Sequence, residues 1–166
     1  MSSRTALAAA LALVLGACGF HLRGSASVPF ETLYIPQAKS GIGLDLKRNI
    51  EANTSAKIIE DPRKAQALLA IAQEARGKQI LSLTGAGRVR EYKLTYTIRF
   101  RVHDGKGGEF VGPSVVELAR EMTYLDTRIL AKESEEQLLF RDMQNQAVQL
   151  ILRRIAAAHP ARPPVE

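Results

Sequence analysis

The stretch from Tyr92 to His103 reads YKLTYTIRFRVH, and its alternation decides the fold. Every second residue is apolar and the residues between are polar or charged, so the two sets point to opposite faces of an extended chain. The apolar set is Tyr92, Leu94, Tyr96, Ile98, Phe100 and Val102. A strand of this kind is half-buried, as in antiparallel sheets. The sequence therefore predicts a long strand with one face on a core and an Arg/Thr face toward polar surroundings.

Turn signals bound this strand at both ends. Gly85-Ala86-Gly87 precedes it and Asp104–Gly108 follows it. The chain before the first turn, from Ala67 to Thr84, is β-prone, with a bulge or bend expected at Gly77-Lys78. These features predict a long hairpin.

A third strand is expected from Val115 to Tyr124. Val116, Leu118, Met122 and Tyr124 would share its apolar side. Glu117 and Glu121 lie on the other side, where we expect them to pair across the sheet with Arg99 and Arg101.

Two helices and two short strands complete the order of elements. Ile42, Leu46 and Ile50 recur every four residues, which predicts a helix from Gly41 to Asn53. Short β-prone runs flank it at 32–35, which Pro36 marks as an edge strand, and at 57–60. A long C-terminal helix is expected to begin at Ser134-Glu135-Glu136-Gln137, which matches a capping box. Its apolar positions are Phe140, Met143, Ala147, Ile151, Ile155 and Ala158.

This order predicts an α+β fold. We expect a single domain over residues 31–159, in which both helices pack on one face of an antiparallel or mixed sheet of about four strands. Hydrophobic residues make up 46% of the chain, which is enough for a core.

The N-terminus has the form of an export signal. Arg4 precedes the apolar run Ala6–Leu15, which is too short to span a membrane. Leu15-Gly16-Ala17-Cys18 resembles the lipobox of bacterial lipoproteins, an ordinary secretory signal being the alternative. The resemblance implies that residues 1–17 are removed and that Cys18 carries a diacylglycerol and an N-acyl chain. Acyl chains in this number hold a protein stably on a membrane.

Three further expectations follow along the chain. Residues 18–30 read as a lipidated tether, and the Pro-rich residues 160–166 read as a disordered tail. Gly19 stands where lipoproteins retained at the inner membrane carry Asp, so resemblance to sorted lipoproteins points to the outer membrane, with the domain on its periplasmic side.

No arrangement of residues supports catalysis or a metal site. The three histidines, His21, His103 and His159, are scattered, and Cys18 is the only cysteine. Glu133, Glu135 and Glu136 read as a helix N-terminus rather than as a catalytic pair. No nucleophile motif or phosphate-binding glycine loop is present. We therefore predict a non-enzymatic protein without a cofactor other than its covalent lipid.

A modest positive charge points to an anionic partner. The chain carries 23 Lys and Arg against 17 Asp and Glu, a net charge of +6. The export signal argues against nucleic acid and favours anionic lipid headgroups or lipopolysaccharide phosphates. Arg88 and Arg90 at the hairpin tip, and Lys132 before the last helix, are the candidate phosphate-binding residues. Simple solvation of these side chains is the alternative.

The start of the mature chain, Cys18-Gly19-Phe20-His21-Leu22-Arg23-Gly24, is similar to that of the LptE family of lipopolysaccharide-assembly lipoproteins. The predicted element order, the Gly-rich turn before Glu91-Tyr92 and Leu130-Ala131-Lys132 also fit this family. The resemblance covers about Cys18 to Ala158.

The resemblance implies a specific role. LptE-like proteins plug the outer-membrane β-barrel LptD in a 1:1 complex, help it to fold, and bind lipopolysaccharide on its way to the cell surface. Lys132 falls where the family has a lipopolysaccharide-contacting lysine. The basic tip position of some members aligns with Gly85, so that Arg88 and Arg90 would replace it. A polar barrel lumen suits a plug with a charged surface.

Three alternatives remain open. The chain could be an auxiliary lipoprotein of another envelope lipid-transport complex, or a lipid-anchored periplasmic enzyme. It could also bind peptidoglycan or anionic lipid without selectivity, in which case salt would abolish binding.

Overall fold

The structure is a computed structural model of the chain, and it describes residues 27–36, 38–124 and 129–159. The signal, the lipobox, most of the expected tether and the C-terminal tail lie outside these residues. The elements in chain order are β1 (Thr32–Tyr34), α2 (Gly41–Asn53), β2 (Lys57–Ile58), the 3-10 turn η1 (Pro62–Lys64), β3 (Ala67–Leu83), β4 (Val89–His103), β5 (Glu109–Thr123) and α3 (Ile129–Ala156).

The strands form one mixed sheet with the order β2-β1-β3-β4-β5. β3, β4 and β5 are an antiparallel meander, whereas β1 is parallel to both β2 and β3. The α+β prediction is confirmed, with five strands in place of about four. The prediction that 32–35 is an edge strand is wrong, because Pro36 follows β1 and leaves both of its edges able to pair.

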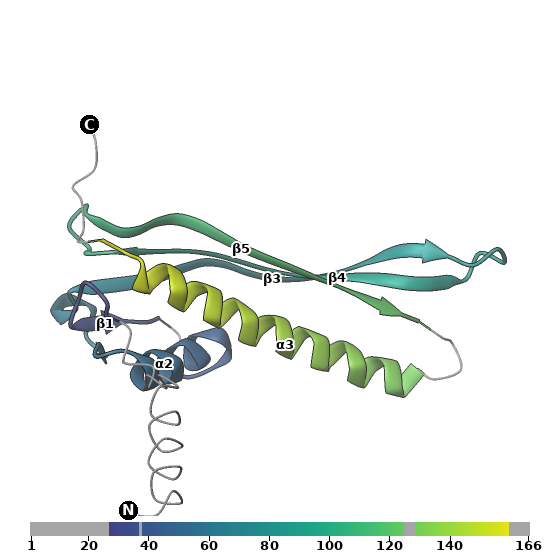
Figure 1. Cartoon of the computed structure of the whole chain (residues 1–166), viewed down its shortest axis with the longest axis horizontal. Coiled ribbons are helices and arrows are strands. Elements are labelled where there is room, and N and C mark those ends of the chain that lie inside the picture. The colour runs from purple at the N-terminus through teal and green to yellow at the C-terminus, as the bar shows by residue number, and fades with distance from the viewer. Residues whose placement is uncertain (1–26, 37, 125–128, 160–166) are drawn as a thin grey trace, which may run out of the picture.

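The β3–β4 hairpin is the longest feature of the sheet (Figure 1). Gly77 was expected to mark a bulge, but it pairs in register with Thr95. The register instead shifts between Ile71 and Gln73, and again next to Ser82. Gly77 allows a close approach rather than a bend, because a Cβ at this position would overlap Thr95 Oγ1.

β5 begins at Glu109, earlier than the predicted Val115, and includes Pro113. β5 is an edge strand, where a missing N–H is tolerated. The register also corrects the predicted ion pairs. Glu117 lies opposite Thr97 and Glu121 opposite Lys93. Arg99 Nε instead donates to Gln73 Oε1 at 3.0 Å, and Arg101 Nη1 lies 3.9 Å from Glu109 Oε1.

Both helices lie on one face of the sheet (Figure 1). α2 has the predicted bounds, but α3 begins at Ile129 rather than at Ser134. Ser134 is inside the helix, and its hydroxyl donates to the Leu130 carbonyl 3.1 Å away. The residues before it, Ile129 to Lys132, include good helix formers and extend the helix beyond the apparent capping box.

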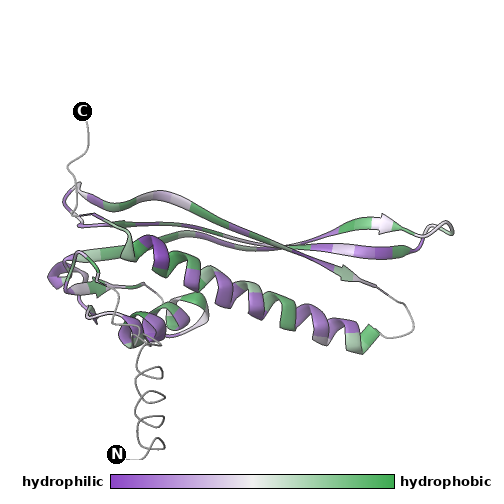
Figure 2. Cartoon of the chain, viewed as in Figure 1, coloured by the Kyte–Doolittle hydropathy of each residue, from purple (hydrophilic) through white to green (hydrophobic). Residues whose placement is uncertain are grey.

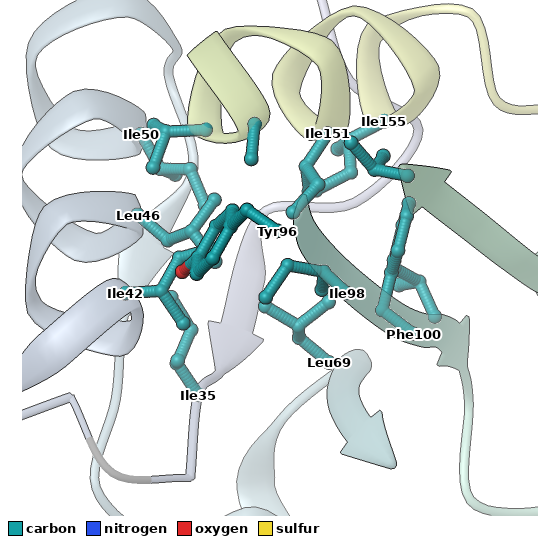
Figure 3. Close-up of a cluster of buried hydrophobic side chains, with 14 of the residues drawn as sticks. Ile35, Ile42, Leu46, Ile50, Leu69, Tyr96, Ile98, Phe100, Ile151 and Ile155 are labelled. Carbon is teal, nitrogen blue, oxygen red and sulfur yellow. The ribbon is translucent and has the colours of Figure 1, made fainter. Parts of the chain in front are cut away.

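The core fills the space between the helices and one half of the sheet (Figure 3). Tyr96 is fully buried among Ile42, Leu46 and Ile50 of α2, and Ile151 of α3 closes the cluster. The Tyr96 hydroxyl donates to Glu74 Oε1 at 2.6 Å, which satisfies its one polar group. The predicted apolar face of Tyr92–His103 is thereby confirmed as the core face of β4.

The hairpin extends beyond both helices. α2 lies against its proximal half, where β1 and β2 extend the sheet beside β3, and α3 runs beneath the meander toward the distal end (Figure 1). The 84–88 turn therefore projects away from the end of the molecule where the described chain begins, next to β1.

Candidate functional site

The candidate site lies at the tip of the β3–β4 hairpin. Thr84 and Arg88 close the turn through a backbone hydrogen bond of 2.7 Å, and Gly87 N donates to Thr84 O at 2.9 Å. Gly87 has φ +76°, a left-handed conformation that favours glycine. The Thr84 hydroxyl also accepts from Arg88 N at 3.2 Å. The local sequence thus fixes a tight turn that places Arg88 directly after it.

The ladder is irregular at this end of the hairpin. Ile80 pairs with Tyr92, Ser82 with Glu91, and Leu83 with Val89. Leu81 on β3 and Arg90 on β4 are therefore left without a partner in the ladder. An extra residue of this kind sharpens the local twist and redirects side chains. Arg88 and Arg90 are both exposed, as the sequence predicted for tip cations.

The same end carries exposed apolar side chains that the sequence did not single out. Ile80 is 59% exposed, Leu81 44% and Leu83 54%. Figure 2 shows hydrophobic colour at the distal end of β3 and at the first turn of α3. Aliphatic residues near a turn are ordinary strand residues in a sequence, so only the structure shows that the described part of the chain leaves these three exposed.

Lys132 lies apart from the two arginines, in the first turn of α3. Its Nζ is 2.6 Å from Glu135 Oε2, and only 16% of its side chain is exposed. The ammonium is thus already paired, unlike an open cation site. α3 begins toward the end of the molecule at which the hairpin projects (Figure 1), so its first turn, which includes Lys132, and the tip lie toward the same end.

A groove between β3 and α3 adds two cations that the sequence reading missed. It has a volume of about 580 Å³ and is lined by Arg76, Gly77, Lys78, Glu133, Glu136, Gln137 and Phe140. Lys78 Nζ lies 2.5 Å from Glu136 Oε2 and 4.4 Å from the ring centre of Tyr92. Arg76 donates to Gln144 at 3.1 Å and stacks 5.3 Å above the Phe140 ring. Both charges are drawn inward, toward α3.

The described residues hold no cluster of His, Cys, Asp and Glu that could bind a metal ion. His103 ends β4, as predicted, and its Nδ1 accepts from Gly105 N at 3.1 Å. Neither helix, within the part of the chain that the structure covers, is long and apolar enough to cross a membrane.

Residues 26–155 match the family model described as LptE, lipopolysaccharide-assembly. The chain belongs to the LptE family. The lipopolysaccharide-assembly lipoprotein LptE of Yersinia enterocolitica is 30% identical over 159 residues, covering 90% of this chain and 73% of that protein. LptE of Photorhabdus laumondii is 26% identical and covers 90% of this chain and 82% of its own length.

Solved structures share the fold of this LptE-family chain. The solution structure of an uncharacterized lipoprotein B from Nitrosomonas europaea has a TM-score of 0.72 and 42% identity, covering 84% of this chain and 91% of that one. The rare lipoprotein B from Shewanella oneidensis has a TM-score of 0.65 and 26% identity, covering 76% of this chain and 94% of that one. The sequence-based resemblance to the LptE family is thereby confirmed.

Proposed function

We propose that this LptE-family chain is an outer-membrane lipoprotein, anchored through Cys18, that plugs an LptD-like β-barrel in a 1:1 complex. In this role it assists assembly of the barrel and binds lipopolysaccharide for delivery to the cell-surface leaflet. The role requires no reaction at the protein and no cofactor beyond the covalent lipid.

The single observation that carries the lipopolysaccharide-binding part is the projecting hairpin tip with Arg88 and Arg90. A guanidinium offers a planar pair of donors that fits phosphate oxygens, and both arginines lie on one exposed ribbon. Lys132 has a lesser part in this proposal, because only 16% of its side chain is exposed, whereas both arginines are exposed.

The outer face of the sheet supports the plug part. Lys93, Arg99 and Arg101 are exposed there, on the face of β4 turned away from the helices. A barrel lumen is polar, so a charged face that the described helices and strands leave exposed fits such a partner.

Charge reversal tests the tip. Arg88→Glu with Arg90→Glu should weaken lipopolysaccharide binding at least about tenfold, because each lost charge-assisted contact is worth on the order of 1.5–3 kcal/mol. The control is Lys57→Glu with Lys64→Glu, which makes the same change in net charge at exposed positions on the opposite side of the fold. Lys132→Gln should have the smaller effect. Equal loss of binding in the control would show that binding depends on the net charge of the chain and not on the two arginines of the tip.

Co-purification tests the partner. The full-length chain, tagged after Glu166 and extracted from outer membranes in mild detergent, should bring down one large β-barrel at equal molar amount. Cys18→Ser should remove acyl-chain labelling and release the protein from the membrane. Recovery with inner-membrane transporter subunits instead would favour an auxiliary lipoprotein of another lipid-transport complex.

A further inference from the structure

The distal end of β3 carries apolar side chains that the described part of the chain leaves exposed. Single exposed apolar residues are common on protein surfaces and need no explanation. Here Ile80, Leu81 and Leu83 fall within four consecutive residues, and each is at least 44% exposed. They occupy the distal end of β3, where a largely polar stretch, 73–79, separates them from the packed proximal part of the strand.

Cations face these residues from the other strand of the same ribbon. Arg88 and Arg90 stand on the return side of the turn, while Leu83 pairs with Val89 between them. At this end of the hairpin, Leu81 and Arg90 have no partner in the β3–β4 ladder, and extra residues of this kind redirect side chains. The tip therefore combines an apolar strand with a cationic strand a single ladder spacing away, about 5 Å.

We propose that the distal end of β3 binds acyl chains of the same lipopolysaccharide molecule whose phosphates are bound by Arg88 and Arg90. This inference rests on the proposed function, and it adds a binding surface for the acyl chains to the one for the phosphates. Lipopolysaccharide carries phosphates and acyl chains on one headgroup, and a surface that offered cations alone would leave the chains in water. Removing apolar surface from water is favourable, so Ile80 and Leu83 add affinity that phosphate contacts do not supply.

The arrangement also predicts which ligands the tip distinguishes. A phosphorylated carbohydrate without acyl chains meets only the arginines, so its binding should fall steeply with added salt. The acylated molecule should keep a salt-resistant part of its affinity, because apolar burial is not screened. The difference between the two ligands measures the contribution of β3.

The test compares two ligands and three variants of the full-length chain, one of which is the Arg88→Glu with Arg90→Glu variant described above. The ligands are purified lipopolysaccharide and its fully deacylated, phosphorylated form. Ile80→Ser with Leu83→Ser should weaken binding of the acylated ligand at least about tenfold and leave binding of the deacylated form unchanged. Leu138→Ser is the matched control, since Leu138 of α3 is 54% exposed, as Leu83 is. It should change neither affinity, and unfolding midpoints verify that each variant folds.

Photocrosslinking locates the contact directly. A photoreactive leucine analogue at position 83 should form an adduct with lipopolysaccharide on an acyl carbon, as read by mass spectrometry, and the same analogue at position 138 should not.

The outcomes separate this inference from the proposed function. If Arg88→Glu with Arg90→Glu abolishes binding while the serine variant binds acylated ligand normally, the tip holds phosphates only and the acyl-chain inference falls. If neither variant changes binding, both fall. Equally tight binding of the chain's tip to vesicles of zwitterionic and anionic phospholipid would make a bilayer surface the occupant, which also overturns the inference.

Discussion

Position 77 shows how a single missing side chain fits two strands together. Gly77 lies in register with Thr95, and the nearest other atom to a Cβ built there would be Thr95 Cβ at 3.7 Å, behind the overlapping hydroxyl. The close packing at this point of the ladder therefore depends on both residues, the missing Cβ of Gly77 and the hydroxyl of Thr95.

We predict that Gly77→Ala lowers the free energy of unfolding by about 1–3 kcal/mol, since the added methyl must displace Thr95 Oγ1. Thr95→Ala removes the obstructing atom. In a double-mutant cycle followed by urea unfolding, Gly77→Ala should cost much less in the Thr95→Ala background. Additive costs would show that the methyl is accommodated without displacing Thr95.

Tyr96 makes stability depend on pH at the alkaline end. Burial, reinforced by the hydrogen bond to Glu74, raises the pKa of the Tyr96 hydroxyl well above its usual value. The neutral form is thus favoured in the folded state. This contribution is fully present below about pH 10, the pKa of an unperturbed tyrosine, and is lost as the pH rises above it.

We predict that the unfolding free energy of the wild-type chain falls above pH 10 by up to about 1.4 kcal/mol per pH unit through this one group. Tyr96→Phe should remove that part of the slope and cost about 1–2 kcal/mol at neutral pH. Tyr34→Phe, in β1, is the control. Denaturant titrations at several pH values compare the three chains, and parallel slopes would contradict the role of Tyr96.

Among the helices and strands, α3 allows a serine in a helix interior to be told apart from a serine at a helix start. Replacing an N-cap serine by alanine lowers the stability of a protein by about 1 kcal/mol. Ser134 instead donates to the carbonyl four residues earlier, where alanine is the better helix former.

We therefore predict that Ser134→Ala leaves stability unchanged or raises it by a few tenths of a kcal/mol, about the difference in helix propensity. The urea midpoint gives the sign. A loss near 1 kcal/mol would restore the helix start at Ser134 and contradict the interior position.

The sequence could predict the elements whose signal is local. The alternation of Tyr92–His103 and the four-residue recurrence in Gly41–Asn53 needed no long-range information, and both elements appear as predicted. The parallel pairing of β1 with β2 and β3 depends on residues distant in sequence, so its interior place in the sheet could not be read from Pro36.

The residues of the candidate site also differ in how far the sequence could predict them. The position of Arg88 and Arg90 at the hairpin tip could be predicted, because a Gly-rich turn marks such a tip. The inward-facing charges of β3 could not, because the register shift after Ile71 changes the phase of the strand. Ile71 faces Phe100 on the core side, whereas beyond the shift it is Arg76 and Lys78 that lie opposite Tyr96 and Leu94. Alternation counted from Leu69 would place them on the opposite face.

For the whole molecule, the uneven position of the core predicts uneven stability. The buried side chains of β3 and β4 end at Leu69 and Leu94 on the side of the turn, and beyond them the side chains become exposed. Local opening is easier where few apolar contacts must be broken.

We predict that amide hydrogen exchange rises along the hairpin. Protection at Leu69 and Ile98 should approach the free energy of global unfolding, whereas amides from Ile80 to Val89 should exchange several orders of magnitude faster. Native-state exchange measured by NMR gives the profile. Uniform protection along both strands would mean that the ribbon is stabilised as one unit with the core.

The length of the hairpin has a consequence for reach. β3 has 17 residues, and at about 3.3 Å per residue it spans roughly 55 Å, whereas the hydrocarbon layer of a bilayer is about 30 Å thick. A domain tethered to one leaflet near β1 and standing upright within a barrel would carry its tip past the opposite leaflet's acyl chains. In the proposed complex, the distance between the two sides of the membrane would then be covered by one ribbon of two strands, while the core of the domain stays in place.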